Sequence, residues 1–226
     1  MTRIKICGLM SVDSALVAAN AGADFLGLVF EPNSRRYLGV EEAKGLVRSF
    51  RAQWNRKDPR WVGVFANQPL EEVNHVLEHC ELDFAQLSGQ ESPEYCRQVA
   101  RPVVKVVHVR SDIPAQEAIG EVGRSLSTYL EDGHMCLLDT FKQGVLGGTG
   151  QAFDWKVARE LARSYSFLLA GGLNPENVSE AIGQVGPWGV DVSSGVETNG
   201  RKSPAMVAAF IIQVRRTDQD LQEAKP

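Results

Sequence analysis

The sequence lacks the features that define several large classes of protein. It holds only four cysteines in 226 residues, far apart and with no Cys-x-x-Cys pair: Cys7, Cys80, Cys96 and Cys136. This spacing predicts neither a disulfide framework nor a zinc knuckle. No apolar run approaches transmembrane length, and the first residues lack the long apolar core of a signal peptide. We therefore expect a cytoplasmic protein that contacts no membrane.

A strong excess of one charge is also missing. Lys and Arg total 24 against 28 for Asp and Glu, which gives a formal net charge of −4, and no long basic block occurs. This balance gives no reason to expect a nucleic-acid partner. If the substrate is an anion, local arginines and backbone amides must attract it, because the overall field of the chain does not.

One short motif resembles the helix of a zinc metalloprotease. The segment "HVLEH", from His75 to His79, matches the H-x-x-E-H pattern. The apolar residues of the same predicted helix lie on the opposite face, so both histidines should face solvent. No third ligand has a compelling position, and His108 and His134 are expected to be structural. We therefore expect no metal site.

Eight short apolar or β-branched runs are the dominant pattern of the chain. In order they are "RIKIC", "FLGLVF", "WVGVF", "DFAQLS", "VVKVVHV", "MCLLD", "FLLAGG" and "GVDVSSG". Nearly every gap between them carries a helical pattern with its own start signal, such as Ser11 or Pro69. Strands that alternate with helices predict a parallel sheet, because parallel strands need crossover connections.

The spacing of these units favours a closed barrel. The repeat is about 28 residues long, which suits a compact (β/α)₈ TIM barrel. An open doubly wound sheet could also use eight strands, but "KICGLMS" has one glycine where that fold carries Gly-x-Gly-x-x-Gly. We predict a single α/β domain, a (β/α)₈ barrel over residues 1–214, followed by a polar tail over residues 215–226.

Cys7 lies at the carboxyl end of the first predicted strand. Alternation along "RIKIC" turns Ile4 and Ile6 toward the helices and leaves Lys5 and Cys7 facing the barrel interior. Barrel enzymes carry their chemistry at this end, and a buried ammonium beside the thiol would favour the thiolate. Two interpretations remain open on pattern alone: a base that takes a proton from a substrate, or a small apolar side chain that fills the core.

Polar residues follow two other strands at the same end. Asp139 in "LLDT" shares the inward alternation of Met135 and Leu137. A carboxyl at an apolar barrel mouth suits a general acid, although it could also cap the following loop. In "EPNSRRYL", one of the adjacent Arg35 and Arg36 could bind a carboxylate with two hydrogen bonds while the other points to water.

The loops after the seventh and eighth predicted strands form the strongest signal for an anion. "FLLAGGLNPENV" contributes Gly171 and Gly172, and "GVDVSSGVETNG" contributes Ser194 and Gly195. Glycines let backbone amides close around an anion, and barrels bind phosphate at these two loops. A third glycine-rich loop, "GVLGGTGQAFDW", could lie over a bound ligand.

Taken together, the motifs resemble the phosphoribosylanthranilate isomerase family of tryptophan biosynthesis. The matching segments, in the family's order and over nearly the whole chain, are "KICGL", "GLVFEPNSRRYL", "VGVFANQPLEEV", "FAQLSGQE", "LLDT", "GGTGQAFDW", "LAGGLNPENV" and "GVDVSSGVE". Three positions depart from the common pattern, because Met10, Arg35 and Ser88 stand where the family commonly has threonine, proline and histidine.

The resemblance implies a (β/α)₈ enzyme without cofactor or metal. Such enzymes convert N-(5-phosphoribosyl)anthranilate into 1-(2-carboxyphenylamino)-1-deoxyribulose 5-phosphate, an Amadori rearrangement. Asp139 would protonate the furanose ring oxygen, and Cys7 would take the proton from C2′. Arg36 would hold the anthranilate carboxylate, and the phosphate would lie at the glycine loops: Gly171, Gly172, Ser194 and Gly195. The partner is then a small phosphosugar, and the chain acts as a monomer or a homodimer.

Two other functions compete with this one. Indoleglycerol-phosphate synthase is similar in its phosphate loops, but it needs a lysine and a glutamate for ring closure and fits the "KICG" and "LLDT" strand ends poorly. A barrel that binds a phosphosugar without turning it over would need neither Cys7 nor Asp139. The presence of both residues favours an enzyme.

Overall fold

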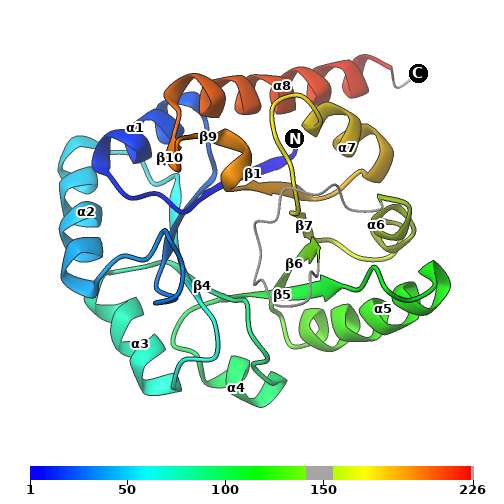
Figure 1. The fold of residues 1–226 in the computed structure, drawn as a ribbon, viewed down its shortest axis with the longest axis horizontal. Helices are drawn as coiled ribbons and strands as arrows, with labels where there is room; N and C mark the ends of the chain where they lie inside the picture. The colour runs from blue at the N-terminus through cyan, green and yellow to red at the C-terminus, as the bar shows by residue number, and fades with distance from the viewer. Residues whose placement is uncertain (141–154, 225–226) are drawn as a thin grey trace.

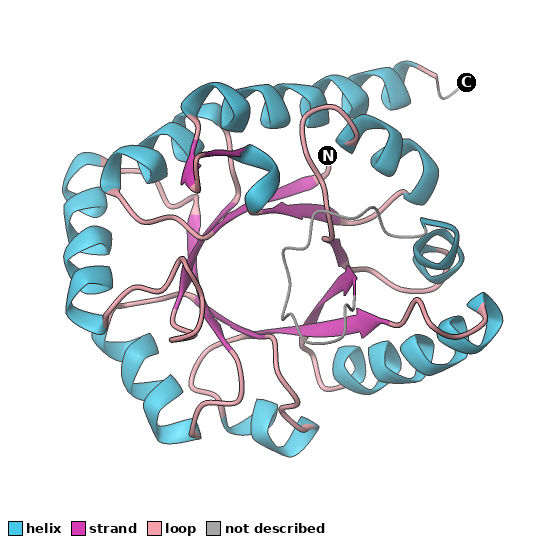
Figure 2. Cartoon of the chain, viewed as in Figure 1, coloured by secondary structure: helices cyan, strands magenta, loops and turns pink. Residues whose placement is uncertain are grey.

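The computed structural model describes residues 1–140 and 155–224. Eight parallel strands close into a barrel, and helices surround it (Figures 1 and 2). The strands are β1 Arg3–Cys7, β2 Phe25–Val29, β3 Arg60–Phe65, β4 Phe84–Leu87, β5 Val103–Val109, β6 Met135–Thr140, β7 Leu168–Leu169 and β8 Gly189–Val192. The helices are α1 Val12–Ala21, α2 Val40–Gln53, α3 Leu70–His79, α4 Pro93–Gln98, α5 Ala115–Glu131, α6 Trp155–Ala162, α7 Val178–Val185 and α8 Pro204–Glu223. The predicted fold class is confirmed.

The barrel closes through β1, which pairs with strands from both ends of the chain. Lys5 of β1 is in register with Phe25 of β2 on one side and with Asp191 of β8 on the other. Between β8 and α8 the chain adds a short 3-10 turn, η1 Ser194–Val196, and a hairpin of β9 Glu197–Thr198 and β10 Arg201–Lys202. This hairpin lies at the carboxyl end of the strands, where the site is found.

Apolar side chains fill the space between the barrel and its helices and part of the barrel interior. The outward residues of the strands, such as the fully buried Ile4 and Ile6, pack with the helices in one large core. A second buried cluster comes from the neighbouring strands β5, β6 and β7 and contains Val104, Val106, Leu137, Leu168 and Ala170. Since barrel strands place alternate residues inward, this cluster fills the part of the interior beside these three strands.

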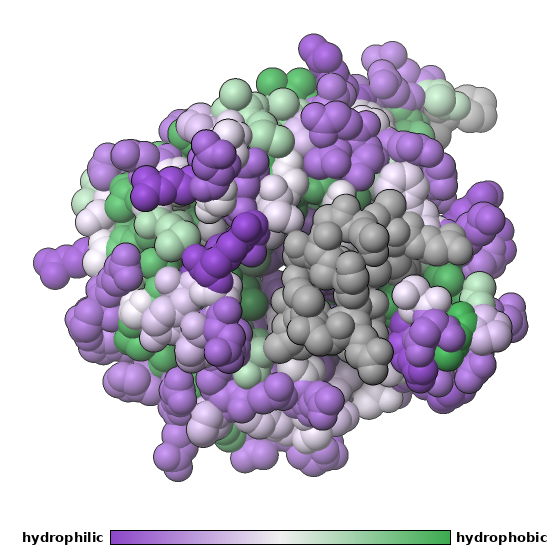
Figure 3. Space-filling view, in the orientation of Figure 1, coloured by the Kyte–Doolittle hydropathy of each residue, from purple (hydrophilic) through white to green (hydrophobic). Residues whose placement is uncertain are grey.

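The outer surface is mainly polar. Figure 3 shows hydrophilic side chains around the rim of the face, with smaller apolar areas between them. Among residues 1–140 and 155–224, no helix is both long and apolar enough to cross a membrane. Of the predicted loop "GVLGGTGQAFDW", residues 144–154 lie outside the part of the chain that the structure describes.

The residues from 215 onward continue α8 as far as Glu223. The helix continues because this segment has partners at the other end of the chain. The carboxylate of Asp218 accepts hydrogen bonds from the Thr2 backbone N–H (2.9 Å) and the Thr2 hydroxyl (2.6 Å). Arg215 donates to the Thr2 carbonyl at 2.6 Å. The C-terminal helix thus holds the residue that precedes β1.

Replacing Asp218 with alanine should lower the free energy of unfolding by about 1–3 kcal/mol, because the buried Thr2 donors lose their acceptor. A urea titration measures this as a lower midpoint with an unchanged slope. Asp220→Ala is the matched control, since Asp220 lies on the same helix and is exposed. Equal midpoints for the two variants would show that the Asp218 contacts add nothing to stability.

Candidate active site

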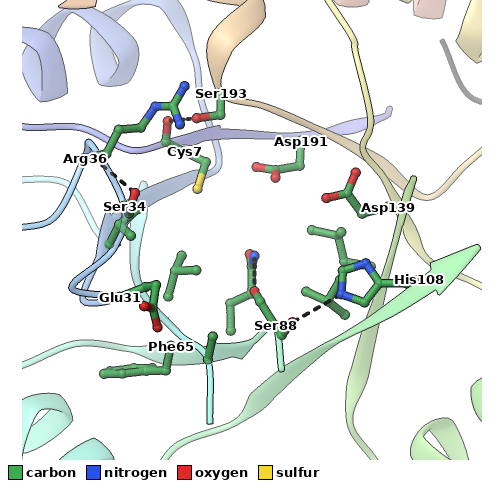
Figure 4. Close-up of a pocket in the computed structure, with 16 residues that line it drawn as sticks. Cys7, Glu31, Ser34, Arg36, Phe65, Ser88, His108, Asp139, Asp191 and Ser193 are labelled. Atoms are coloured by element: carbon green, nitrogen blue, oxygen red, sulfur yellow. Dashed lines mark hydrogen bonds between the residues drawn. The ribbon is translucent and has the colours of Figure 1, made fainter. Parts of the chain in front are cut away.

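Cys7, Arg36 and Asp139 line one cavity at the carboxyl end of the barrel (Figure 4). They come from the end of β1, the loop after β2 and the end of β6. The cavity also has an apolar wall made by Val29, Val64, Phe65, Ala66, Val106 and Leu137. Its other polar residues are Glu31, Ser34, Gln86, Ser88, His108, Asp191 and Ser193. The structure thus brings Cys7, Arg36 and Asp139, from three distant parts of the sequence, to one cavity.

Cys7 and Asp139 lie on different sides of this cavity. In the barrel, β7 and β8 separate β6 from β1, and Figure 4 shows Asp191 of β8 between the thiol and the carboxyl. Both side chains point inward, as alternation along the two strands predicts. Two groups that can donate and accept protons therefore flank the position where a ligand would lie.

A buried ion pair lies directly below the thiol. Lys5 Nζ donates to Asp191 Oδ1 at 2.9 Å, and the Lys5 side chain is 1% exposed. Burial by itself would lower the pKa of Lys5, but Asp191 and the Cys7 sulfur outweigh it and raise this pKa to about 12. The ammonium is therefore charged at neutral pH and interacts with the sulfur of Cys7.

Gly27 of β2 leaves room for the Lys5 ammonium to lie beside the Cys7 sulfur. A Cβ atom at that position would lie 3.0 Å from the Cys7 Sγ atom and 3.2 Å from Lys5 Nζ. Any side chain would therefore push the sulfur and the ammonium apart. The glycine in "FLGLVF" thus has a packing reason that the strand pattern alone did not reveal.

The other three cysteines are buried away from the cavity. Burial raises the pKa of Cys80 and Cys96 to about 11 and that of Cys136 to about 12. Their thiols stay protonated at neutral pH. Cys7 is the cysteine that lines the cavity and has a buried cation beside it.

The two adjacent arginines have different surroundings. The Arg36 side chain is 13% exposed and lines the cavity, whereas the Arg35 side chain is 60% exposed. Both donate to the buried carboxylate of Glu197, Arg35 from the solvent side. Figure 4 also shows the Arg36 backbone N–H donating to the Ser34 hydroxyl, at 3.1 Å. The structure thus distinguishes the arginine that faces the cavity from its neighbour.

The four residues expected to bind phosphate lie on the loops after β7 and β8. Gly171 and Gly172 follow β7 with left-handed φ angles of +93° and +70°. Ser194 and Gly195 begin η1, and a Cβ atom on Gly195 would overlap the carbonyl oxygen of Leu173. The two loops therefore pack backbone against backbone. None of the four lines the cavity in Figure 4, which the neighbouring residue Ser193 reaches instead.

Sequence reasoning missed several residues of the cavity. His108, expected to be structural, faces the cavity beside Asp139, with which it is in register across β5 and β6. Its Nε2–H donates to the Ser88 carbonyl at 3.2 Å. The signal was present in "VVKVVHV", because the alternation that turns Val104 and Val106 inward also turns His108 inward.

The metalloprotease-like histidines lie on the outside of the barrel. His75 and His79 stack on α3 with ring centroids 5.2 Å apart, and His79 Nε2 contacts a Glu41 carboxylate oxygen at 2.6 Å. Within residues 1–140 and 155–224, no group of three or more His, Cys, Asp or Glu residues is placed to hold a metal ion.

Comparison of the sequence with known families gives a match over most of the chain. Residues 4–213 match the model of the N-(5'-phosphoribosyl)anthranilate (PRA) isomerase family. A curated N-(5'-phosphoribosyl)anthranilate isomerase from Dehalococcoides mccartyi is 44% identical over 218 residues, which cover 96% of this chain and 98% of the relative. Another, from Roseiflexus castenholzii, is 44% identical over 214 residues, which cover 94% and 97%.

Solved structures agree with the sequence match. Phosphoribosyl anthranilate isomerase from Thermotoga maritima has a TM-score of 0.82 and 32% identity, and covers 96% of this chain and 100% of its own. A phosphoribosyl anthranilate isomerase in complex with reduced 1-(o-carboxyphenylamino)-1-deoxyribulose 5-phosphate has a TM-score of 0.79, 32% identity and the same coverage. A third structure, of monomers of the dimeric Thermotoga maritima enzyme, has a TM-score of 0.78, 33% identity and again the same coverage.

Proposed function

The chain belongs to the phosphoribosylanthranilate isomerase family, and we propose that it converts N-(5-phosphoribosyl)anthranilate into 1-(2-carboxyphenylamino)-1-deoxyribulose 5-phosphate. This Amadori rearrangement is a step of tryptophan biosynthesis, which we place in the cytoplasm. The observation that carries the proposal is the pairing of Cys7 and Asp139 across one cavity, in a chain that is 44% identical to named isomerases.

In the first step Asp139 acts as the general acid. Its carboxyl proton moves to the furanose ring oxygen while the bond from that oxygen to C1′ breaks. The lone pair of the anthranilate nitrogen forms a C=N bond to C1′, so the open-chain intermediate is a protonated Schiff base. Leu137 and Val106 are among the apolar residues that line the same cavity as this carboxyl.

In the second step Cys7 acts as the general base. Its thiolate takes the proton from C2′, and the electrons of that C–H bond form a C1′=C2′ double bond while the nitrogen becomes neutral. The enolamine then becomes the ketone, as the C2′ hydroxyl loses a proton and C1′ gains one. The buried and charged ammonium of Lys5 interacts with the sulfur that would carry out this step.

The two ends of the substrate are anions, and each has a separate anchor in the proposal. Arg36 holds the anthranilate carboxylate, and Gly171, Gly172, Ser194 and Gly195 hold the phosphate through backbone and hydroxyl groups. Anchors at both ends keep the ribose between the acid and the base, so that binding energy is converted into orientation. The ligand named in the similar complex carries both a carboxyl and a phosphate group, which supports this division.

Replacing Gly195 with alanine should weaken binding of the reduced product analogue by at least about tenfold. A methyl group there overlaps the Leu173 carbonyl oxygen, so the two phosphate loops must separate and lose charge-assisted hydrogen bonds. Isothermal titration calorimetry measures the effect. Gly183→Ala is the matched control, because Gly183 lies in α7 with no atom near the position of the added methyl. Equal affinities for both variants would remove Gly195 from the phosphate site.

The function is tested by turnover of freshly generated phosphoribosylanthranilate, followed through the loss of its fluorescence with EDTA present and no cofactor added. We expect turnover by the purified chain. A folded chain that binds the reduced product analogue without turnover would instead support a non-catalytic phosphosugar-binding barrel. Formation of indoleglycerol phosphate from the ketose would support the competing synthase.

A further inference from the structure

Glu197 is a buried carboxylate that the isomerase chemistry does not use directly. It lies on β9, and its side chain is 4% exposed. Burial by itself would raise the pKa of Glu197, but hydrogen bonds from Arg36 and Lys202 outweigh it and hold this pKa below its usual value. An ionised carboxylate at this position is costly to bury, so its contacts need an explanation.

The contacts of Glu197 fix the orientation of the Arg36 guanidinium. Arg36 Nε donates to Glu197 Oε1 at 2.6 Å, and Arg36 Nη2 donates to Glu197 Oε2 at 3.0 Å. Two parallel hydrogen bonds hold one edge of the planar group and leave little freedom of rotation. Within residues 1–140 and 155–224, Nη1 of Arg36 donates to no protein group, so the outer end of the guanidinium is available to a ligand.

Lys202 holds the carboxylate from its other side. Its Nζ donates to Glu197 Oε1 at 2.6 Å and to the Ser193 carbonyl at 2.9 Å, and its side chain is 3% exposed. Ser193 in turn donates from its hydroxyl to the Cys7 carbonyl at 3.1 Å, as Figure 4 shows. The contacts therefore connect Arg36 to the backbone of the proposed base.

The hairpin explains how the sequence places these two residues together. Glu197 and Lys202 are directly paired across β9 and β10. Asn199 and Gly200 form the turn between them with φ angles of +53° and +75°, the conformation that Asn-Gly favours in two-residue hairpins. A six-residue segment thus presents an acid and a base side by side against Arg36.

The charges of the cluster favour an anionic ligand. Two largely buried cationic side chains, from Arg36 and Lys202, contact one carboxylate, so positive charge remains in excess. Without Glu197, the Arg36 guanidinium would be drawn to carboxylates that line the same cavity, such as Asp191 or Glu31. Pairing with either would cover the surface that a ligand carboxylate needs.

We propose that Glu197 is a positioning residue that holds the Arg36 guanidinium ready for the aromatic carboxylate of the substrate, with Lys202 keeping Glu197 in place. The proposal rests on the proposed function, since it assigns a device for recognising one end of that substrate. On this proposal, the hairpin of β9 and β10 contributes to the preference for a ligand with a carboxylate on its aromatic ring over a ligand with an unsubstituted phenyl ring.

The test compares two stable ligands by calorimetry. One is reduced 1-(o-carboxyphenylamino)-1-deoxyribulose 5-phosphate, and the other is its counterpart with an unsubstituted phenyl ring. In Glu197→Gln, we expect the preference for the carboxylated ligand to fall by about tenfold or more, because a charge-assisted bidentate contact is lost. Affinity for the phenyl ligand should stay within about twofold, since that ligand has no carboxylate for Arg36 to bind. With substrate, KM should rise more than kcat falls.

Three further variants keep the result interpretable. Arg36→Met should abolish the preference, and Arg35→Ala should leave it within about twofold, because Arg35 contacts Glu197 from the solvent side. Glu197→Gln alone leaves the buried Lys202 cation without its carboxylate, which could unfold the chain. The double variant Glu197→Gln with Lys202→Met removes the buried anion and the buried cation together and should therefore stay folded. It should show the same loss of preference.

Equal weakening of both ligands in the Glu197 variants would overturn the proposal, because it would indicate a purely structural role. An unchanged preference in Glu197→Gln or in Arg36→Met would overturn it as well. Failure of the wild type to turn over phosphoribosylanthranilate would count against the proposed function alone, since the binding comparison needs no turnover.

Discussion

Asp139→Asn should lower kcat for the isomerisation by about 10²- to 10⁴-fold, the usual contribution of a general acid. Asparagine has nearly the same size and shape as aspartate but has no acidic proton. Without that proton the ring oxygen must leave as an alkoxide, so ring opening becomes the slow step. Affinity for the reduced product analogue should change by less than about fivefold, since the amide still fits the cavity wall and accepts hydrogen bonds.

The measurement is steady-state turnover beside calorimetric binding of the analogue. Asp112→Asn is the matched control, because Asp112 lies on the same end of the barrel, in the loop after β5, and its side chain is 64% exposed. It should keep wild-type turnover. If Asp139→Asn turned over at the wild-type rate, another group would have to protonate the ring oxygen. His108, in register with Asp139, would be the first candidate.

Cys7→Ala should lower kcat by a similar factor, about 10²- to 10⁴-fold, because alanine cannot take the C2′ proton. Cys7→Ser gives a sharper test. A hydroxyl has the size of the thiol but ionises far less readily, so the serine variant should be nearly as slow as the alanine variant. Activity close to wild type in Cys7→Ser would mean that position 7 acts as a hydrogen-bonding group and not as a base.

Deuterium at C2′ of the substrate provides an independent readout. Where proton removal limits the rate, the deuterated substrate should react more slowly with the wild-type chain. Cys96→Ala serves as the control for loss of a buried thiol, since Cys96 is 2% exposed, lies outside the cavity and has a pKa raised by burial to about 11. It should lose stability but keep the catalytic rate. Full activity of a folded Cys7→Ala would exclude the thiol from the mechanism.

Ser88 stands where the family commonly has histidine, and the structure places another histidine next to it. The family resemblance commonly places histidine at this position, whereas here a histidine on the neighbouring strand, His108, donates to the Ser88 carbonyl. Both residues line the cavity. An imidazole is therefore present in this region of the cavity, although it comes from β5 and not from the end of β4.

Much of the fold could be predicted because strands and helices are encoded locally. Period-two alternation in "RIKIC" and "LLDT" placed Cys7 and Asp139 inward, and the structure agrees. The capping signal at Ser11 also holds, since its hydroxyl accepts from the Ser14 N–H ahead of α1. The polar stretch "RAQWNRKDPR", residues 51–60, is typical of a loop, but α2 continues to Gln53 and β3 begins at Arg60. Buried Phe50 packs on Trp61, which favours one more turn of helix.

The contacts that shape the site could not be read in the same way. Lys5 and Asp191 are 186 residues apart, Arg36 and Glu197 are 161 apart, and Thr2 and Asp218 are 216 apart. Each of these polar residues looks like an ordinary charged or capping residue in its own segment. Only closure of β1 against β8 and packing of the hairpin against the loop after β2 bring the pairs together.

The sequence by itself therefore determined the strands, the barrel and the end at which polar groups gather. Those features depend on periodicities of two and 3.6 residues, which any single segment carries. The tertiary structure alone decided which acid meets which base, with Asp191 beside Lys5 and Glu197 between Arg36 and Lys202. These choices depend on strand register and on close packing across the closed barrel, and both are properties of the whole chain.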